Sequence, residues 1–249
     1  MQQFDTSPLA AGRDNKMGRM TTTASPVVWT PPARVRGTLA VIAGRGERAS
    51  VYERFGRRLS ADGYTVAVFE ADADAAVDWL AASSDVPRVL VGSDSGAAAA
   101  LHRLARGAEA EGGIVAGVLL DAEGEVPADE ERTACPLHLG VLADAASRTE
   151  PAPAEPLPPA AELAAVAVPV LAVHGGADPV SAIADAASAL RAVPDLELLE
   201  TVGGLHDALN DQSHRSVAAR IVLWLERLRG GDVRTPVVRT RGLTEADDA

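Results

Sequence analysis

The sequence predicts an α/β fold, with a doubly wound and mostly parallel β-sheet and helices on both of its faces. Short apolar runs alternate with helical patterns along most of the chain, which is typical of this fold class. The apolar runs lack alternating polar residues, as expected for strands that are buried on both faces. A third observation is the motif Gly-Ser-Asp-Ser-Gly at 92–96, which follows a strand-like run and precedes a helix-like run.

Each element is placed by its own pattern. Strands are expected in short runs rich in Val, Leu and Ile, and helices in longer amphipathic or Ala-rich runs. The expected strands span residues 38–43, 65–69, 88–91, 114–120, 168–173 and 197–201. The expected helices span residues 49–61, 73–82, 96–106, 181–193 and 213–229.

A single folded domain is expected at residues 26–232, with a tail at each end. Residues 1–25 and 233–249 are polar and lack periodicity, so we predict that both tails are disordered. The stretch at about 122–163 interrupts the alternation, because it begins with acidic residues and ends in a Pro-rich segment at 151–159. We interpret it as a short cap insertion, whose prolines favour loops over packed helices.

Composition and charge argue against several classes of function. The chain has 249 residues, of which 47% are hydrophobic and only 3% aromatic, so Ala, Val and Leu must build the core. The net charge of −12 disfavours binding to nucleic acid or to anionic membranes. No run approaches the roughly 18 apolar residues of a membrane span, and the N-terminus lacks a signal-peptide pattern. We expect a cytoplasmic protein with a small-molecule substrate; the oligomeric state cannot be predicted.

The sequence indicates no metal and no cofactor. The single cysteine, Cys135, excludes an internal disulfide and lies in an apolar stretch, as is typical of a buried structural thiol. No paired spacing of Cys and His suggests zinc. Gly44 and Gly46 lack the third glycine of a dinucleotide-binding fingerprint.

The motif at 92–96 matches a nucleophile elbow, in which a strand, a tight turn and a helix surround the pattern G-x-nucleophile-x-G. Gly92 and Gly96 are the small residues that this crowded turn requires. The central position is usually serine, but here it is Asp94, and aspartate tolerates a positive φ better than most residues. Its carboxylate would lie near a helix N-terminus, which favours negative charge. Asp94 is therefore the expected nucleophile.

Alternatives stay open at this position. Asp94 could instead cap the helix of a scaffold that has lost the serine chemistry. A register shift by one residue would make Ser95 the nucleophile, because the residues at 93 and 97 are also small. The strand ends at 91–92, which fits a nucleophile at 94 better. We interpret Ser95 as a backbone donor to an oxyanion hole and Ser93 as a turn hydroxyl.

Two further residues complete the order nucleophile, acid, histidine. Asp178 follows the strand at 168–173 and would hold a histidine tautomer, or else cap a helix before Pro179. Asp121 is a second candidate for the acid. His206 follows the strand at 197–201 on a Gly-rich loop, and histidine suits a general base near neutral pH. His102, His174 and His214 are interpreted as structural or solvated. His138 could line the cap region, but nothing in the sequence indicates a specific role for it.

A second oxyanion donor is expected after the first long strand. Gly44 and Arg45 follow this strand, and the backbone N–H of Arg45 would act beside that of Ser95. The same glycines would equally serve a tight turn between a strand and a helix.

These segments together resemble the α/β-hydrolase superfamily, in its monoacylglycerol lipase or lysophospholipase-like branch. The resemblance spans about residues 27–230 and rests on the motifs at 44–54, 92–96, 173–179 and 203–207. It implies an esterase-like hydrolase with a catalytic triad. The chain departs from the pattern at Asp94, where that branch has serine, and at Ala43, where the family usually has histidine.

An aspartate at the elbow is similar instead to the haloalkane dehalogenase and epoxide hydrolase branches. Dehalogenases typically have Trp after the nucleophile, whereas this chain has Ser95, and both tyrosines precede the elbow rather than lying in the cap as in epoxide hydrolases. We predict a hydrolase in which Asp94, His206 and Asp178 act on a small apolar ester-like or alkyl substrate. The alternatives are non-covalent acid/base chemistry on a natural product and a non-catalytic ligand-binding protein.

Overall fold

The computed structural model describes residues 25–239, in which seven strands form one sheet. Its strand order is β1-β3-β2-β4-β5-β6-β7, and every neighbouring pair is parallel except β1 and β3. The strands are β1 (Val27–Trp29), β2 (Gly37–Ile42), β3 (Tyr64–Phe69), β4 (Arg88–Ser93), β5 (Gly112–Ala116), β6 (Val170–Gly175) and β7 (Leu196–Thr201). The predicted mostly parallel, doubly wound sheet is confirmed.

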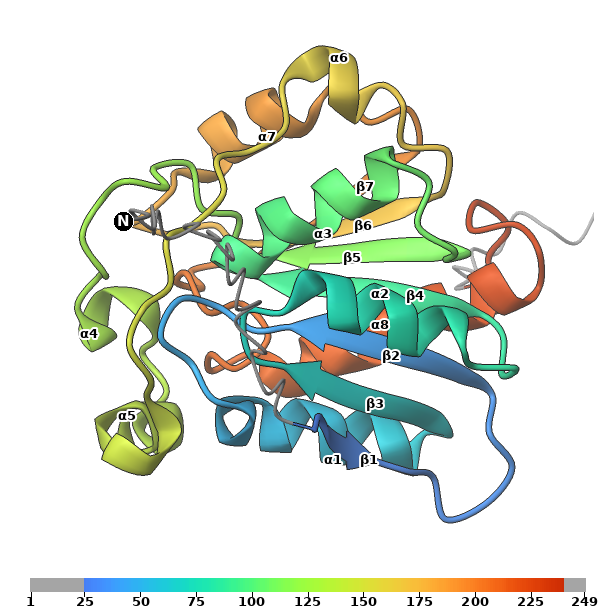
Figure 1. Cartoon of the computed structure of the whole chain (residues 1–249), viewed down its shortest axis with the longest axis horizontal. Coiled ribbons are helices and arrows are strands. Elements are labelled where there is room, and N and C mark those ends of the chain that lie inside the picture. Colours follow the sequence, from blue (N-terminus) through green and yellow to red (C-terminus); the bar gives the residue numbers. More distant parts are fainter. Residues whose placement is uncertain (1–24, 240–249) are drawn as a thin grey trace, which may run out of the picture.

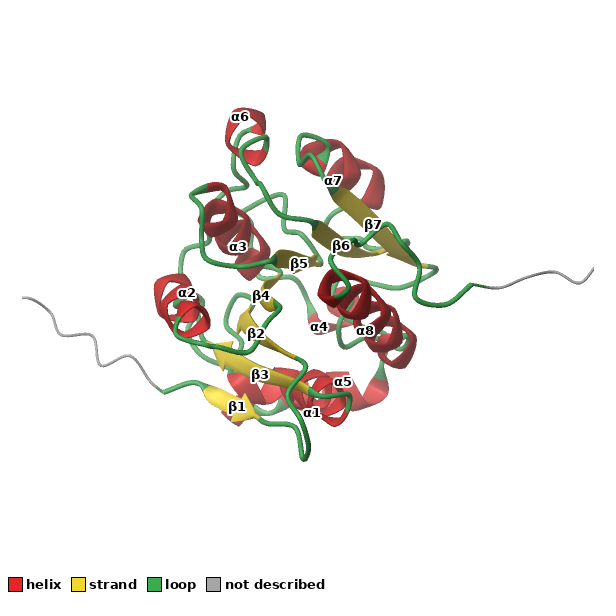
Figure 2. Cartoon of the chain, turned by 90° about the vertical axis from the view of Figure 1, so that its right-hand side faces the viewer, coloured by secondary structure: helices red, strands yellow, loops and turns green. Residues whose placement is uncertain are grey.

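Helices cover both faces of this sheet (Figure 2). One face carries α1 (Glu53–Ala61), which follows the 3-10 turn η1 (Ala49–Tyr52), and α8 (His214–Arg229). The other carries α2 (Ala73–Ala81), α3 (Ser95–Ala105) and α7 (Ile183–Leu190).

Alternation along the strands divides the core into two layers. In β2, Leu39 and Val41 pack toward α1 and α8, whereas Ala40 and Ile42 pack toward α2 and α3. All six residues of β2 are buried, which is why this run has no polar alternation in the sequence.

The C-terminal ends of the parallel strands meet at one edge of the sheet. The register pairs Ile42 with Gly92 and Ser93 with Ala116, so the segments that follow β2, β4 and β5 emerge together. Gly175 pairs with Thr201, which brings the segments after β6 and β7 to the same edge. In Figure 1 the strands point toward the side where α4 and α5 lie. This edge holds the candidate site.

The stretch at 122–163 contains helices where the sequence analysis predicts loops. They are α4 (Asp129–Arg132), α5 (Pro136–Ala143), the 3-10 turn η2 (Ala145–Ser147) and α6 (Ala160–Leu163). Pro136 is the first residue of α5, where a missing N–H costs nothing because that group has no partner inside the helix. Proline therefore begins a helix here.

The strand expected at 114–120 ends at Ala116. Gly117 turns the chain with φ +50°, and a Cβ at this residue would lie 2.2 Å from the carbonyl oxygen of His206. Asp121 therefore does not end a strand, and its Oδ1 accepts the N–H groups of Glu123 and Gly124 in an exposed turn. This corrects its interpretation as a second candidate for the acid.

The remaining differences lie near the ends of the chain. The edge strand β1 was not predicted. Most of the two predicted tails, residues 1–24 and 240–249, lies outside the described residues. Val233 begins the predicted C-terminal tail but is buried in the core. Within residues 25–239, no helix is long and apolar enough to cross a membrane.

Candidate active site

The turn between β4 and α3, at the position of the predicted nucleophile elbow, is strained. Asp94 lies at its apex with φ 51° and ψ −122°. A Cβ at Gly92 would lie 2.1 Å from the carbonyl oxygen of Gly96, and a Cβ at Gly96 would lie 2.3 Å from that of Ile42. Both positions therefore require glycine. Ser93 ends β4 and Ser95 begins α3, so the residue with a positive φ in this turn is Asp94.

The carboxylate of Asp94 does not cap α3, although the residue occupies the N-cap position. Its Oδ2 accepts the backbone N–H of Arg45 at 2.8 Å, and the Arg45 Nε lies 3.5 Å from the same oxygen. Its Oδ1 lies 3.3 Å from Nε2 of His206. The prediction that the Asp94 side chain caps the helix is therefore wrong, and the expected donor Arg45 contacts Asp94 itself.

Asp178 and His206 are brought together by the segments that follow β6 and β7. Nδ1 of His206 lies 2.8 Å from Oδ2 of Asp178. The other oxygen, Oδ1, accepts the N–H groups of Val180 and Ser181 at 2.8 and 3.1 Å. Asp178 thus forms a local turn as well as the contact with His206, and α7 begins only at Ile183.

His174 is a contact of the acid that the sequence analysis treated as structural. Its Nε2 lies 2.7 Å from the carbonyl oxygen of Ser181 and 3.0 Å from Oδ2 of Asp178. Because a carbonyl oxygen only accepts hydrogen bonds, this Nε2 carries the hydrogen. Asp178 is therefore held by two histidines and two backbone amides.

The buried charges determine the protonation of His206. Burial lowers the pKa of His206, but hydrogen bonds to Asp178 and Asp94 outweigh it and raise the pKa to about 10. Burial alone would raise the pKa values of Asp94 and Asp178. Both pKa values are nevertheless below their ordinary values, and hydrogen bonds with histidine are the largest cause of this lowering. At neutral pH the site is therefore an imidazolium between two carboxylates.

A second group of buried polar side chains adjoins these three residues, and we call it the Arg132 network: Glu47, Tyr52, Arg132, His138 and Asp207. Arg132 of α4 donates to Glu47 and, at 2.9 Å, to Oδ2 of Asp207. His138 of α5 contacts the same Asp207 oxygen at 2.8 Å. Coulombic attraction of Arg132 lowers the pKa of Asp207 against the effect of burial.

The Arg132 network reaches both loops of the candidate site. Glu47 accepts the N–H of Gly44 at 3.1 Å and the hydroxyl of Tyr52, and the same N–H also donates to the Tyr52 oxygen at 2.9 Å. Asp207 directly follows His206, and its N–H donates to the Arg132 carbonyl oxygen at 2.8 Å. Arg132 thus joins the insertion at 122–163 to the loops that carry Arg45 and His206.

A cavity of about 310 Å³ borders the elbow. Arg45 and Ser95 line it, together with acidic residues of the loop before α2 and of the segment at 149–155. Asp94 and His206 are not among the lining residues, and only 5% and 1% of their surfaces are exposed. The Arg45 guanidinium, held by the Gly124 carbonyl oxygen at 3.0 Å, lies beside Asp94 in the cavity wall. This lining mixes charged and apolar side chains, whereas the sequence analysis predicts a small apolar substrate.

The other singled-out residues lie apart from this arrangement. His102 contacts Glu162 at 2.8 Å, and His214 contacts the Asp211 carbonyl oxygen at 3.0 Å. Cys135 is buried, with the Arg54 guanidinium 3.4 Å from its sulfur. No group of His, Cys, Asp and Glu among residues 25–239 could hold a metal ion.

Comparisons with known proteins identify the fold. No family model matches the chain, and no curated protein does. A monoacylglycerol lipase from Paleococcus ferrophilus is 14% identical with a TM-score of 0.66, over 82% of this chain and 99% of its own. A soluble monoglyceride lipase variant from Saccharomyces cerevisiae is 16% identical with a TM-score of 0.66, over 82% and 91%. A carboxyl esterase from Bacillus coagulans is 14% identical with a TM-score of 0.62, over 81% and 93%. The chain therefore has the α/β-hydrolase fold.

Proposed function

We propose that this protein is a hydrolase in which Asp94, His206 and Asp178 act together on a small ester-like or alkyl substrate. The different contacts of the two Asp94 carboxylate oxygens support this most directly. Oδ2 is held by the Arg45 N–H at 2.8 Å, and Oδ1 faces His206 at 3.3 Å. One oxygen is thus placed to become the carbonyl oxygen of an ester, and the other to form its new bond. The similarity to lipases and esterases supports hydrolysis as the reaction class.

The first step is attack of Asp94 Oδ1 on a saturated carbon of the substrate. The Oδ1–carbon bond forms as the bond to the leaving group breaks, and the leaving group departs with that electron pair. Oδ2 becomes the carbonyl oxygen of the resulting ester.

In the second step, water adds to the carbonyl carbon of this ester while His206 accepts a proton from the water. The negative charge that develops on Oδ2 is stabilised by the backbone N–H groups of Arg45 and Ser95. When the ester collapses, the alkoxide takes the proton from His206 and leaves Asp94 as a carboxylic acid. Asp94 then gives its proton to the neutral His206, which restores the carboxylate and the imidazolium of the resting site. Asp178 holds the imidazole through Nδ1.

The charges of the resting site explain why the two reaction steps occur in this order. With Asp94 ionised, the pKa of His206 is about 10, and the imidazole is protonated at neutral pH. Ester formation removes the Asp94 charge, so the pKa of His206 falls, and the imidazole releases its proton to solvent. The base therefore becomes available after the covalent step, when it is needed.

The cavity beside the elbow favours a substrate with polar groups. Its lining includes Glu70, Asp74 and Glu150 beside apolar residues, so an entirely apolar molecule would leave these carboxylates without a partner. We therefore retain the ester-like or alkyl class from the sequence analysis but not its restriction to apolar substrates.

The decisive experiment is intact-protein mass spectrometry of His206→Gln after incubation with esters, epoxides and alkyl halides. Without the base, the second step stops and an adduct accumulates, and peptide mapping is expected to place it on Asp94. Asp94→Asn is the matched control and should form none. An adduct on Ser95 or Ser93 would replace the aspartate mechanism with a serine one. Absence of both adduct and wild-type turnover would remove the covalent hydrolase proposal.

Non-covalent acid/base chemistry is the second candidate, and the high pKa of His206 favours it. A protonated His206 beside an ionised Asp94 is an acid next to a base. A single turnover in ¹⁸O-labelled water distinguishes the two mechanisms. The covalent route transfers one water oxygen into the Asp94 carboxylate, whereas turnover without this label favours acid/base chemistry.

A further inference from the structure

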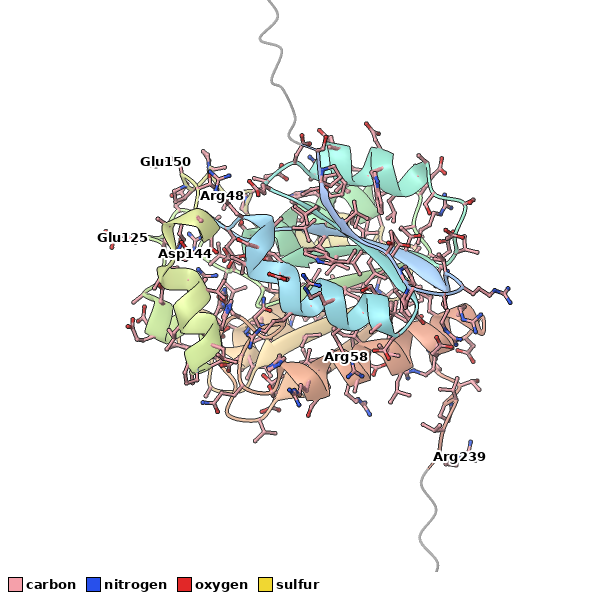
Figure 3. All side chains as sticks on the ribbon, turned by 90° about the horizontal axis from the view of Figure 1, so that it is seen from below. Arg48, Arg58, Glu125, Asp144, Glu150 and Arg239 are labelled. Atoms are coloured by element: carbon pink, nitrogen blue, oxygen red, sulfur yellow. The ribbon has the colours of Figure 1, made fainter. Side chains whose placement is uncertain are left out.

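A groove lies between α1 and the beginning of α8, on the face of the sheet opposite to α2 and α3. Figure 3 shows these two helices side by side, with Arg58 where they adjoin. The groove has a volume of about 340 Å³. Its walls carry Arg54, Arg58, His214 and Arg215. None of the acidic residues within 25–239 lines it, although the chain as a whole has a net charge of −12.

The positive charge of these walls is neutralised only in part. Arg58 donates to Asp62 at 2.9 Å across an exposed contact. Arg54 donates to the carbonyl oxygen of Asn210 and to the sulfur of Cys135, and within residues 25–239 it forms no ion pair with a carboxylate. Among the described residues, Arg215 forms no ion pair. Three arginines thus line the groove, and within the described part of the chain the one carboxylate that pairs with any of them, Asp62, lies outside its lining.

The lowered pKa of His214 is consistent with the same excess of positive charge. Burial is the largest cause that lowers its pKa, and the charges of Arg54 and Arg215 lower it further. Nδ1 of His214 contacts the carbonyl oxygen of Asp211 at 3.0 Å, so Nδ1 carries the hydrogen. Nε2 remains free to donate to an anion once it is protonated.

The floor of the groove is apolar. Phe55, Leu209 and Ala218 form it, and each is at most 3% exposed. A short hydrocarbon portion would contact this floor and the methylene stems of the arginines above it, whereas a bare inorganic ion would not. The guanidinium forks above the floor match the oxygen geometry of carboxylate and phosphate groups.

We propose that this groove is a binding site for a small organic anion, whose carboxylate or phosphate group contacts Arg58 and Arg215 while its short apolar portion packs on Phe55. The site is separate from Asp94 and His206 and does not depend on the proposed hydrolase activity.

Isothermal titration calorimetry with butyl phosphate and butanoate tests this site at fixed ionic strength. Both anions should bind the wild-type protein, and inorganic phosphate should bind more weakly because it has no hydrocarbon portion to contact the floor and the arginine stems. The variant Arg58→Gln/Arg215→Gln should lose affinity by roughly tenfold or more for each guanidinium removed. Both side chains are exposed, so the unliganded Tm should hardly change.

Arg57→Gln is the matched control, because Arg57 lies on α1 beside Arg58 but pairs with Glu53 at 2.6 Å and does not line the groove. It should leave the affinity unchanged. In NMR spectra, butyl phosphate should shift the imidazole signals of His214 and leave those of His206 in place. Equal losses in both variants, binding of butylammonium, or no saturable binding of either butyl anion would overturn the proposal. Binding to phosphatidic acid vesicles without binding of butyl phosphate would overturn it in favour of a membrane surface.

Discussion

The backbone amide of Arg45 donates a hydrogen bond to Oδ2 of Asp94 at 2.8 Å. In an oxyanion hole, such an amide is aimed at the oxygen of a reacting substrate. Here a carboxylate oxygen of the chain itself occupies that position, and the Arg45 side chain lies over the same oxygen. A substrate oxygen cannot use this donor while Asp94 keeps it. The arrangement therefore suits chemistry in which Asp94 is the group that changes.

Replacing Asp94 with Asn should lower the pKa of His206. The variant keeps the shape of the side chain but removes one of the two carboxylates that raise this pKa to about 10. Asp178 still contacts Nδ1, so the pKa should settle between the ordinary value of about 6.5 and the wild-type value. Titration of the histidine ring protons by NMR measures it. An unchanged His206 titration would show that Asp94 does not contribute to its pKa.

His206 should also make the stability depend on pH above neutrality. Its folded-state pKa is raised, so protonation of His206 stabilises the folded state fully below pH about 6.5. This contribution declines as the pH rises and is lost through pH about 10. Urea unfolding at pH 6, 8 and 10 should therefore show the difference between wild type and His206→Gln shrinking with pH. Subtracting the free energy of unfolding of His206→Gln from that of wild type cancels the contributions of other titrating groups, including Cys135. A constant or growing difference would contradict the ionised state of His206.

The variant Asp94→Ser should hydrolyse activated esters such as p-nitrophenyl acetate. A serine at 94 would lie at the same strained apex, within reach of His206, and would leave the Arg45 amide free for the substrate oxygen. Removal of the carboxylate also lowers the pKa of His206 toward the range of a general base. The double variant Asp94→Ser/His206→Gln is the control and should be inactive. Equal rates in the two variants would mean that the histidine is not positioned to activate position 94.

The main elements of this fold could be predicted because its strands are buried on both faces. The continuous apolar run of β2 left few alternatives for its position, and the tight turn at 92–96 fixed the start of α3 to within one residue. The positions of Asp94, Asp178 and His206 could be predicted from the positions of these strands. Each follows a parallel strand, and parallel strands end at one edge of a sheet.

The Arg132 network could not be predicted, because no local pattern indicates it. Arg132 lies in an acidic segment that is typical of a solvated surface, yet its partners Glu47 and Asp207 are 85 and 75 residues away in the sequence. Glu47 and Tyr52 belong to a motif that carried the family resemblance, but nothing in its spacing indicates a buried cation between them and Asp207. Such contacts depend on how the insertion folds back over the sheet.

Replacing Arg132 with Met should destabilise the protein by about 3–5 kcal/mol, because it leaves two buried carboxylates without their cation. Urea unfolding at neutral pH measures this loss. Arg48→Met is the control, since the Arg48 side chain is half exposed and its ion pair with Glu70 at 3.5 Å should contribute at most about 1 kcal/mol. Adding Glu47→Gln to Arg132→Met removes one of the unpaired charges and should recover part of the stability, whereas Glu47→Gln alone should destabilise. If Arg132→Met and Arg48→Met are equally stable, the network does not hold the insertion to the loops of Arg45 and His206.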